Sequence, residues 1–383
     1  MPLTRDSQLL VAGQGVRAFG YGFTAVLLGS LLAVRGYSHL RAGALLTCLI
    51  AGTALASLVV GAGADRWGRR RCYAAVFTLI GIAGALVALG APYPVLVLVA
   101  LTGALSTDVV DNGPATTLEQ VMLAADDAGT ARVYGVYNSV GAAAGALGAL
   151  AQTVPGVSPH HAWLFAVLVL VGAAGCGLAA ALSRGVETPV GTSRSRTPAP
   201  PVVRRMAALF AMDAAGGGLV TTAFLSYLFT ERYGVSVGRL GVLFFAVALI
   251  QAGAVMVAPR LARRFGLVAT MVGTHLPSNV LLAAIAFAPS FAVAAALLLL
   301  RTTLSQMDVP ARQALVMSVV DPEQRIQAAA VTNAARYSVR PLGPVIAGAL
   351  QQVSLGAPLL VAGTVKGGYD LLLWRWARRQ GLP

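Results

Sequence analysis

Long apolar stretches separated by short polar turns run through the whole chain. Each stretch is about 20 residues or longer, and a helix of that length crosses the roughly 30 Å hydrocarbon core of a bilayer. The stretches lack the strict alternation of apolar and polar residues that a membrane-barrel strand requires. The pattern therefore predicts an all-α membrane protein with twelve transmembrane helices. Their approximate ranges are 8–34, 40–64, 72–91, 93–122, 131–154, 161–183, 204–231, 238–260, 266–288, 290–317, 324–351 and 356–376.

A polar, basic and proline-rich segment interrupts this pattern near the middle of the chain. It contains the run Thr-Ser-Arg-Ser-Arg-Thr-Pro-Ala-Pro-Pro. Such a composition buries too little apolar surface to form a packed core. We therefore predict a cytoplasmic linker at residues 184–203. It would join an N-terminal six-helix bundle, residues 1–183, to a C-terminal six-helix bundle, residues 204–383.

Short motifs of the first half recur in the second half. A Ser-x-x-Arg-x-Gly motif begins at Ser38 and again at Ser236, which is 198 residues later. The pair Pro-Ala begins at Pro114 and again at Pro310, which is 196 residues later. Because the offset drifts by only a few residues along the half, the matches indicate an internal duplication.

The composition excludes a soluble protein, since 57% of the residues are hydrophobic and only 11% are charged. The formal net charge of +14 is typical of nucleic-acid binding, but here the arginines lie in short loops rather than on one soluble face. Anionic lipid headgroups are therefore the expected counter-charge, and no nucleic-acid partner is expected.

The basic loops also predict the orientation of the chain in the membrane. Four arginine-containing segments fall on one side of the predicted spans, whereas the turns around Pro92, Pro155 and Pro289 carry no Lys or Arg. Basic loops stay in the cytoplasm, so both termini are expected there, in a cell membrane such as the bacterial inner membrane. The basic segments are 66–71, 184–205, 260–264 and 375–379.

The loop between the second and third predicted spans has a specific spacing. From Gly61 to Arg70 it reads Gly-x-x-x-Asp-Arg-x-Gly-Arg-Arg. This spacing resembles, at every fixed position, the loop between helices 2 and 3 of the major facilitator superfamily of secondary transporters. A second copy at 260–266 has Arg263 where Asp65 would stand, so the role of this loop is expected to rest on the first half.

The resemblance implies a fold of two pseudo-symmetric six-helix bundles around a central cavity, which opens to each side in turn. It also implies a gating role for the loop. Gly61 is expected to let another helix approach closely, and Gly68 to allow a sharp reversal. The gating residues are Gly61, Asp65, Arg66, Gly68, Arg69 and Arg70.

Charged residues inside the predicted spans are candidates for the substrate and coupling site. An ionisable group within a membrane costs several kcal/mol unless it is paired or hydrated. In the superfamily, spans 1, 4, 7 and 10 line the cavity, and all four carry charge here. The alternative is a static salt-bridge network that holds the halves together. The candidates are Arg17, Asp108, Asp111, Asp213, Arg301, Asp308, Arg336 and Arg340.

Spacing divides these candidates by chemistry. Asp108 and Asp111 are three residues apart and share a helical face, so their repulsion favours holding a proton. They are the expected coupling site, with Asp213 or Asp308 as alternatives. Arg336 and Arg340 are four residues apart, and a pair of arginines suits a carboxylate or phosphate. Arg17 and Asp213 align across the repeat, 196 residues apart, and are a candidate pair.

The remaining polar residues are expected to be structural. Lys366 and Asp370 are four residues apart on the last span and are expected to neutralise each other. The histidines and cysteines have no ligand spacing, and no nucleophile or nucleotide-binding motif occurs. We therefore expect no metal, no cofactor and no enzymatic activity. Structural roles near helix ends are expected for Glu119, Arg132, Arg312 and Arg325.

These features predict a monomeric secondary transporter of a small-molecule solute, surrounded by membrane lipids. The first hypothesis is a proton-coupled exporter of drug-like or amphipathic molecules. Exporters of the superfamily often carry a glycine- and proline-containing pattern in span 5, and here Ala146 replaces the proline between Gly145 and Gly148. The second hypothesis is a transporter of an organic anion, whether importer, exchanger or facilitator. A non-transporting membrane sensor is a third. The direction of transport stays open.

Overall fold

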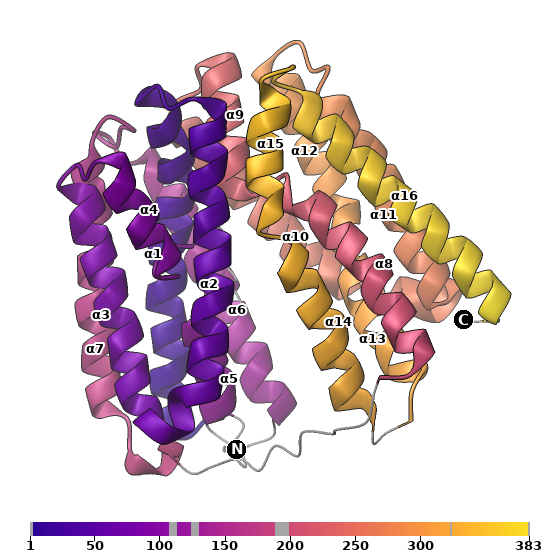
Figure 1. Cartoon of the computed structure of the whole chain (residues 1–383), viewed down its shortest axis with the longest axis horizontal. Helices are drawn as coiled ribbons and strands as arrows, with labels where there is room; N and C mark the ends of the chain where they lie inside the picture. Colours follow the sequence, from indigo (N-terminus) through magenta and orange to yellow (C-terminus); the bar gives the residue numbers. More distant parts are fainter. Residues whose placement is uncertain (1–2, 107–112, 124–129, 188–198, 322–323, 382–383) are drawn as a thin grey trace. The chain divides into compact units, whose positions relative to one another are not determined.

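The computed structural model describes residues 3–106, 113–123, 130–187, 199–321 and 324–381. Within these ranges the regular structure is helical, and no strand occurs (Figure 1). Among the described residues, eight helical segments are long and apolar enough to cross a membrane. The count of twelve spans stays a prediction beyond these eight.

The N-terminal helices follow the predicted order. Thr4 is the N-cap of the first helix. Its hydroxyl accepts a hydrogen bond from the Ser7 amide at 3.2 Å, which is the usual arrangement at a helix N-cap. The helices are α1 Arg5–Val34, α2 His39–Trp67, α3 Arg69–Ala88, α4 Tyr93–Leu101, α5 Pro114–Leu123, α6 Thr130–Leu150 and α7 Val167–Ala181. Short 3-10 turns are η1 Ala151–Thr153, η2 Ala162–Ala166 and η3 Arg184–Glu187.

Several later spans are divided into two helices each. The span predicted at 204–231 breaks after Gly216-Gly-Gly218, where glycine weakens the helix. The helices are α8 Pro201–Gly218, α9 Thr222–Tyr233, α10 Val237–Phe265, α11 Leu267–Ile285, α12 Phe291–Ser305, α13 Asp308–Ser318, α14 Arg325–Val339, α15 Leu342–Gln351 and α16 Ala357–Gln380.

The chain forms two compact units. The first comprises Met1–Tyr37, Ala44–Thr192 and Thr222–Phe245, and the second comprises Ser38–Gly43, Ser193–Thr221 and Ala246–Pro383. We describe each unit by itself and call them unit 1 and unit 2. The boundaries expected for the two bundles and the linker stay predictions.

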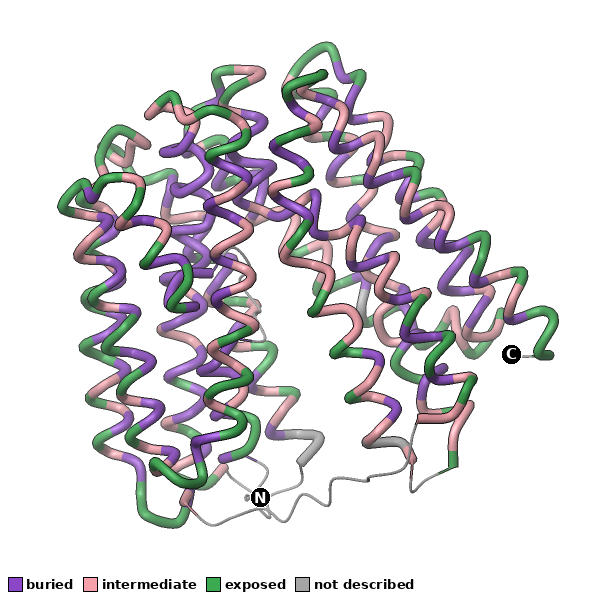
Figure 2. The backbone as a smooth tube through the Cα atoms, in the orientation of Figure 1, coloured by how far each residue is buried: buried purple, intermediate pink, exposed green. Residues whose placement is uncertain are grey.

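Helix α1 is the central element of unit 1. It packs against α6 and α9, while α3 packs against α7 (Figure 1). Residues 20–32 of α1 are all buried (Figure 2). A Cβ atom added at Gly22 would lie 2.1 Å from the carbonyl oxygen of Gly145, and one at Gly148 would lie 2.1 Å from that of Phe19. Small residues let these helices approach backbone to backbone.

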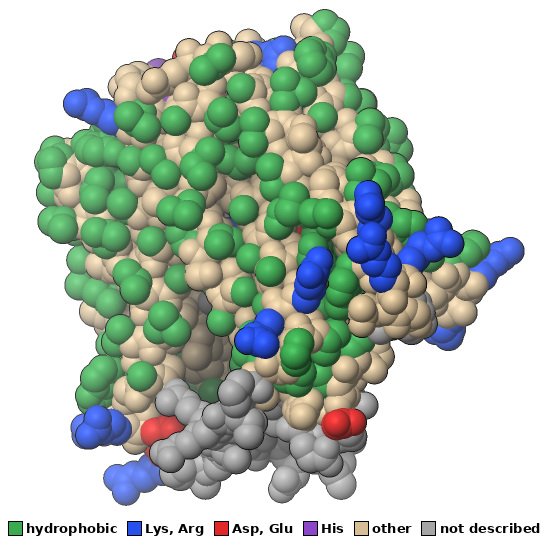
Figure 3. Space-filling view, turned by 45° about the vertical axis from the view of Figure 1, so that its right-hand side comes forward, with side chains coloured by type: hydrophobic (Ala, Val, Ile, Leu, Met, Phe, Trp, Pro, Cys, Tyr) green, Lys and Arg blue, Asp and Glu red, His purple; other side chains and the backbone are tan. Residues whose placement is uncertain are grey.

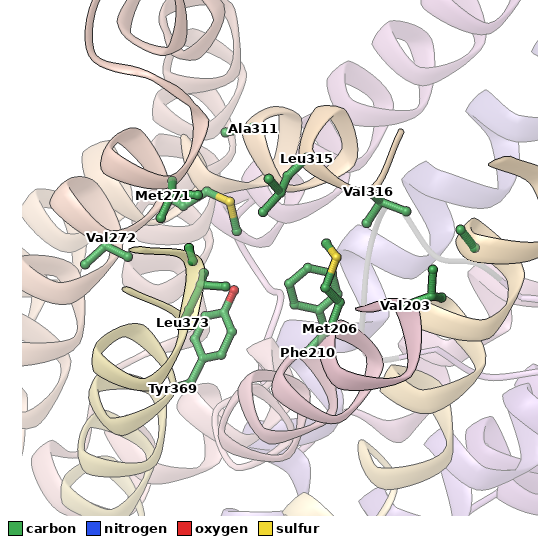
Figure 4. Packing of buried hydrophobic residues seen from close by; sticks show 13 residues of the cluster. Val203, Met206, Phe210, Met271, Val272, Ala311, Leu315, Val316, Tyr369 and Leu373 are labelled. Atoms are coloured by element: carbon green, nitrogen blue, oxygen red, sulfur yellow. The ribbon is translucent and has the colours of Figure 1, made fainter. Parts of the chain in front are cut away.

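Unit 2 has an apolar core between α8, α11, α13 and α16. Met206 and Phe210 of α8 pack in this core with Met271 of α11, Leu315 of α13 and Tyr369 of α16 (Figure 4). The same four helices carry the charged network of unit 2 described below, which includes Asp213, His275, Arg312 and Lys366, so this core sets the separation of these side chains.

The surface of the protein exposes many large apolar side chains. Leu58, Leu170, Met256 and Val280 are 65–73% exposed, and hydrophobic side chains are scattered over much of the face drawn in Figure 3. A soluble protein rarely exposes this much apolar surface, whereas lipid solvates it without penalty.

Candidate functional site

Arg17 of α1 is the centre of a buried polar network in unit 1. Its guanidinium is 1% exposed. Its Nη2 atom lies 2.8 Å from Oε2 of Glu119, donates to the hydroxyl of Thr116 at 2.9 Å, and also contacts the side chain of Gln14. Arg17 and Glu119 therefore form a buried ion pair.

Glu119 of α5 also accepts hydrogen bonds from two tyrosines. Tyr73 of α3 donates to its Oε1 at 2.7 Å, and Tyr137 of α6 donates to its Oε2 at 2.5 Å. Both carboxylate oxygens are thus bonded, as a buried charge requires. From the sequence we expected a structural role for Glu119 near a helix end. The sequence gives no sign of its network, because its partners lie on three other helices.

A larger charged network occupies unit 2. The carboxylate of Asp213 on α8 is bound by the ammonium of Lys366 on α16 and lies 3.4 Å from Nη1 of Arg312 on α13. The same Nη1 atom is 3.3 Å from Oδ2 of Asp308. All four side chains are buried. Arg312 therefore bridges two of the predicted site carboxylates.

The expected pairing of Lys366 with Asp370 is wrong. Lys366 turns to Asp213, while Oδ1 of Asp370 lies 2.8 Å from Nδ1 of His275 on α11. Asn279 donates to the other oxygen of Asp370 at 2.8 Å. Both carboxylates are buried and need partners: Lys366 supplies one to Asp213, while His275 and Asn279 supply those of Asp370.

His275 joins the two parts of this network. Its Nε2 atom is 3.6 Å from Oδ1 of Asp213, on the side of the ring opposite the contact with Asp370. The ring also packs edge-on against Tyr369. Nothing near His275 in the sequence signals these contacts, since its partners are about 60 and 95 positions away.

Two predicted site arginines of unit 2 form no direct ion pair with a carboxylate among the residues that the structure describes. Arg301 of α12 and Arg336 of α14 are half-buried, and the Nε atom of each has no hydrogen-bond partner in the part of the chain that the structure describes. Arg340 lies between α14 and α15, where its carbonyl oxygen packs against Gly218. Asp108 and Asp111 lie outside the described residues.

The two networks are related by the internal repeat. Residues 17 and 116 contact each other in unit 1, and residues 213 and 312 contact each other in unit 2, each pair shifted by 196 positions. In unit 1 the position on α1 is the cation, Arg17, and in unit 2 the position on α8 is the anion, Asp213. Each of the two positions forms an ion pair within its own unit, and the pairing of Arg17 with Asp213 stays a prediction.

The predicted gating loop is anchored within unit 1. Gly68 has a φ of 90°, which favours glycine. Nη2 of Arg69 lies 2.7 Å from Oδ1 of Asp65, and Nη1 of Arg69 donates to the carbonyl of Val186 at 3.2 Å. The side chain of Asp65 is 61% exposed, so it is accessible to a partner.

Glu187 caps the helix that follows this loop. Its carboxylate accepts from the backbone amides of Arg69 at 2.7 Å and Arg70 at 3.1 Å, which are unpaired donors at the start of α3. The guanidinium of Arg70 donates to the carbonyl of Ala180. Sequence reasoning missed Glu187, because this contact joins positions about 118 apart.

Gly61 does not have the close contact expected for it. Among the described residues, the nearest atom to a Cβ placed there is a methyl carbon of Thr117, at 3.9 Å. Close backbone approaches of this unit occur at other glycines, Gly22 and Gly148 among them.

Comparisons with known proteins agree with this architecture. The family model described as Major Facilitator Superfamily matches residues 10–344. The uncharacterized membrane protein YJR124C of Saccharomyces cerevisiae (strain ATCC 204508 / S288c) is 23% identical, with 97% of this chain and 93% of that protein covered. The nucleoside transporter NupG has a similar structure, with 15% identity, 97% of each chain covered and a TM-score of 0.77. The human organic anion transporter MFSD10 (TETRAN) also has a similar structure. It is 17% identical, the alignment covers 97% of this chain and 100% of that one, and the TM-score is 0.66.

Proposed function

The chain belongs to the Major Facilitator Superfamily, and on that premise we propose that it is a proton-coupled transporter of an organic anion. That it is a membrane transporter of some solute follows from the family. The proposal concerns the charge of the solute and the coupling ion. We further propose that both termini are cytoplasmic and that Asp65 and its loop act as a gate.

The observation that carries the proposal is a pair of arginines, Arg301 and Arg336, that form no direct ion pair within the described part of the chain. The guanidiniums of Arg301 and Arg336 lie in unit 2 beside a network whose carboxylates are already engaged by Arg312, Lys366 and His275. A half-buried guanidinium without a counter-charge is costly. A carboxylate or a phosphate group offers two oxygen acceptors to the paired N–H donors of a guanidinium. An anionic solute would therefore be bound by two guanidiniums that no described carboxylate contacts directly.

Arg17 is not part of this anion site in our proposal. Its charge is neutralised by Glu119 within the same unit, so an anion would have to compete with a bonded carboxylate. The anion-binding role is therefore assigned to unit 2.

Export of drug-like or amphipathic molecules is the second candidate. The small-residue run of α6 favours it, since exporters of the superfamily carry a related pattern there. However, Gly145 and Gly148 pack directly on α1, and a Cβ at Gly141 would clash with the side chain of Gln14. Close helix packing accounts for these glycines without reference to export.

Transport by purified protein in proteoliposomes tests the proposal. The probes are benzoate, succinate and glycerol 3-phosphate as anions, tetraphenylphosphonium as a lipophilic cation, and a neutral sugar. We expect at least one anion to accumulate when a pH gradient is imposed. We also expect Arg301→Gln and Arg336→Gln each to weaken its binding at least tenfold, with Arg239→Gln, at an exposed position near the start of α10, as control. Transport of only the cation or the sugar would overturn the proposal.

A further inference from the structure

The second copy of the gating-loop motif, at residues 260–266, has no role in the function proposed above. Its glycine is kept, since Gly266 has a φ of 88°, close to the 90° of Gly68 in the first copy. Its acid is lost, because Arg263 stands where Asp65 would be. The sharp reversal between two helices is therefore preserved, whereas the carboxylate that pairs with an arginine of the first loop is missing from the second.

Two helices of unit 2 end in the same arrangement of exposed arginines. In each helix, three arginines are spaced at i, i+3 and i+4, so that they lie on one side of the helix. We call these six residues the basic end of unit 2. They are Arg260, Arg263 and Arg264 of α10 and Arg375, Arg378 and Arg379 of α16.

The packing of unit 2 brings these two helix ends to the same end of the unit. Helix α11 begins directly after α10, and it runs antiparallel to α16. His275 of α11 contacts Asp370 of α16, and farther on Val268 near the start of α11 shares an apolar core with Ala377 near the end of α16. The arginines that end α10 and α16 therefore lie at the same end of unit 2.

No carboxylate among the described residues forms an ion pair with the basic end. Of the described acidic residues of unit 2, Asp213, Asp308 and Asp370 are buried in the charged network, and Asp321 is exposed. Like charges three and four residues apart destabilise a helix. The basic end therefore favours an anion from outside the chain.

The helix dipole explains only part of this arrangement. A cation in the last turn of a helix is favourable, which accounts for the two arginines in the last turn of α10 and of α16. Arg260 and Arg375 lie about one turn earlier, where they add charge of the same sign and gain little from the dipole.

Aromatic side chains accompany both sets of arginines. The guanidinium carbon of Arg264 lies 5.3 Å from the centre of the Phe265 ring, and that of Arg378 lies 5.7 Å from the centre of the Trp374 ring. A guanidinium above a ring keeps the N–H groups in its own plane free to donate. Trp376 is also half-buried, and tryptophan is enriched at the headgroup level of a bilayer.

The apolar side chains next to the arginines indicate the kind of anion. Met256 lies four residues before Arg260 and is 73% exposed, and Leu371 lies four residues before Arg375 and is 54% exposed. Residues four apart lie on the same side of a helix. Each set of arginines thus continues an exposed apolar surface, as a charged headgroup continues its acyl chains.

We propose that the basic end of unit 2 binds the phosphate groups of acidic phospholipids and prefers a lipid that carries two phosphates, such as cardiolipin. Guanidiniums bind phosphate oxygens through paired N–H donors, and clusters of basic residues at the cytoplasmic ends of membrane helices recognise such headgroups. Lipid binding at this end is independent of the solute and the coupling ion proposed above.

Native mass spectrometry of the full chain, purified in detergent, measures the binding of single lipid molecules. The probes are cardiolipin, phosphatidylglycerol and phosphatidylcholine, each added at the same concentration. We expect cardiolipin to bind at least tenfold more tightly than phosphatidylcholine, with phosphatidylglycerol between them. Phosphatidylcholine bound as tightly as cardiolipin would overturn the proposal.

Substitutions in either helix end locate the site. We expect the double variant Arg375→Gln with Arg378→Gln to weaken cardiolipin binding at least fivefold, and Arg260→Gln with Arg264→Gln to do the same. All four positions are exposed, so the variants are expected to fold. Full cardiolipin affinity in both double variants would exclude the basic end as the site.

The matched control is Arg41→Gln with Arg239→Gln. It also removes two exposed positive charges, but Arg239 lies near the opposite end of α10. We expect cardiolipin affinity to change less than twofold. A loss as large as that of the other double variants would show an effect of total charge alone and would contradict a defined site.

Competition separates a lipid from a soluble anion. Inorganic phosphate or a short RNA is added to the cardiolipin complex at the same concentration as the lipid. We expect cardiolipin to stay bound, because neither competitor has acyl chains to contact the exposed apolar side chains. Displacement of cardiolipin by either one would assign the basic end to a soluble anion instead.

Discussion

At the scale of single residues, Arg17 and Glu119 show how a buried charge depends on its partner. The pair is 1% and 0% exposed, and the two atoms that meet are 2.8 Å apart. Removing one partner of a buried pair costs about 3–5 kcal/mol, whereas replacing both by apolar groups of similar size is often close to neutral. Stability should therefore depend on the pair rather than on either residue.

We predict that Arg17→Met and Glu119→Leu each lower the thermal unfolding midpoint and the yield of folded protein, and that the double variant recovers most of the loss. The reason is that each single change leaves an uncompensated charge among apolar side chains. The measurement is thermal unfolding in detergent, combined as a double-mutant cycle. Losses that simply add in the double variant would show that the contact contributes no coupling.

At the scale of the helices, the contact between α1 and α6 depends on the absence of side chains. A Cβ at Gly148 would lie 2.1 Å from the carbonyl oxygen of Phe19, whereas a Cβ at Gly135 of the same helix meets no atom of the described residues within 4 Å. Backbone atoms cannot move aside as a flexible side chain can, so one added methyl group must separate the helices.

Gly148→Ala should therefore destabilise the protein by roughly 1–3 kcal/mol, the usual cost of overpacking. The matched control is Gly135→Ala, which should be neutral or stabilise by about 0.5–1 kcal/mol, because alanine favours the helix. The midpoint of unfolding in detergent checks both. Equal effects of the two changes would indicate that α1 and α6 are not in close contact in the folded protein.

At the scale of the whole molecule, transport in this family requires the two halves to move relative to each other. The loop at Asp65 is fixed within its own unit by Arg69, Val186 and Glu187, but the Asp65 side chain itself is exposed. Its carboxylate is therefore available to a partner that changes between transport states, and it contributes little to the stability of unit 1.

We predict that Asp65→Asn lowers the transport rate at least fivefold and leaves the unfolding midpoint within about 2 °C of the unmodified protein. Asparagine keeps the size and an acceptor for Arg69 but removes the charge. Initial rates in proteoliposomes and thermal unfolding are measured on the same preparations, with Asp321→Asn as the control. A normal rate would end the gating proposal, and a large loss of stability would make Asp65 a structural residue.

Part of the site was predictable because it depends on local pattern. Arg17, Asp213, Asp308 and Arg301 were recognised because a charge inside an apolar span is expensive and therefore conspicuous. The repeat offset of 196 aligned positions 17 and 213, and the structure shows each of them in the charged network of its own unit. What the sequence does not contain is the partner of each charge.

The sequence by itself determined the helical membrane class, the family and the positions of the buried charges, since each follows from hydrophobic periodicity or fixed spacing along the chain. The tertiary structure decided which charges meet. It paired Lys366 with Asp213 instead of Asp370, brought His275 between two carboxylates, and placed Glu187 on the start of α3. These pairs join residues far apart in the chain, and their energies depend on burial and on the separation of packed helices, which no local pattern encodes.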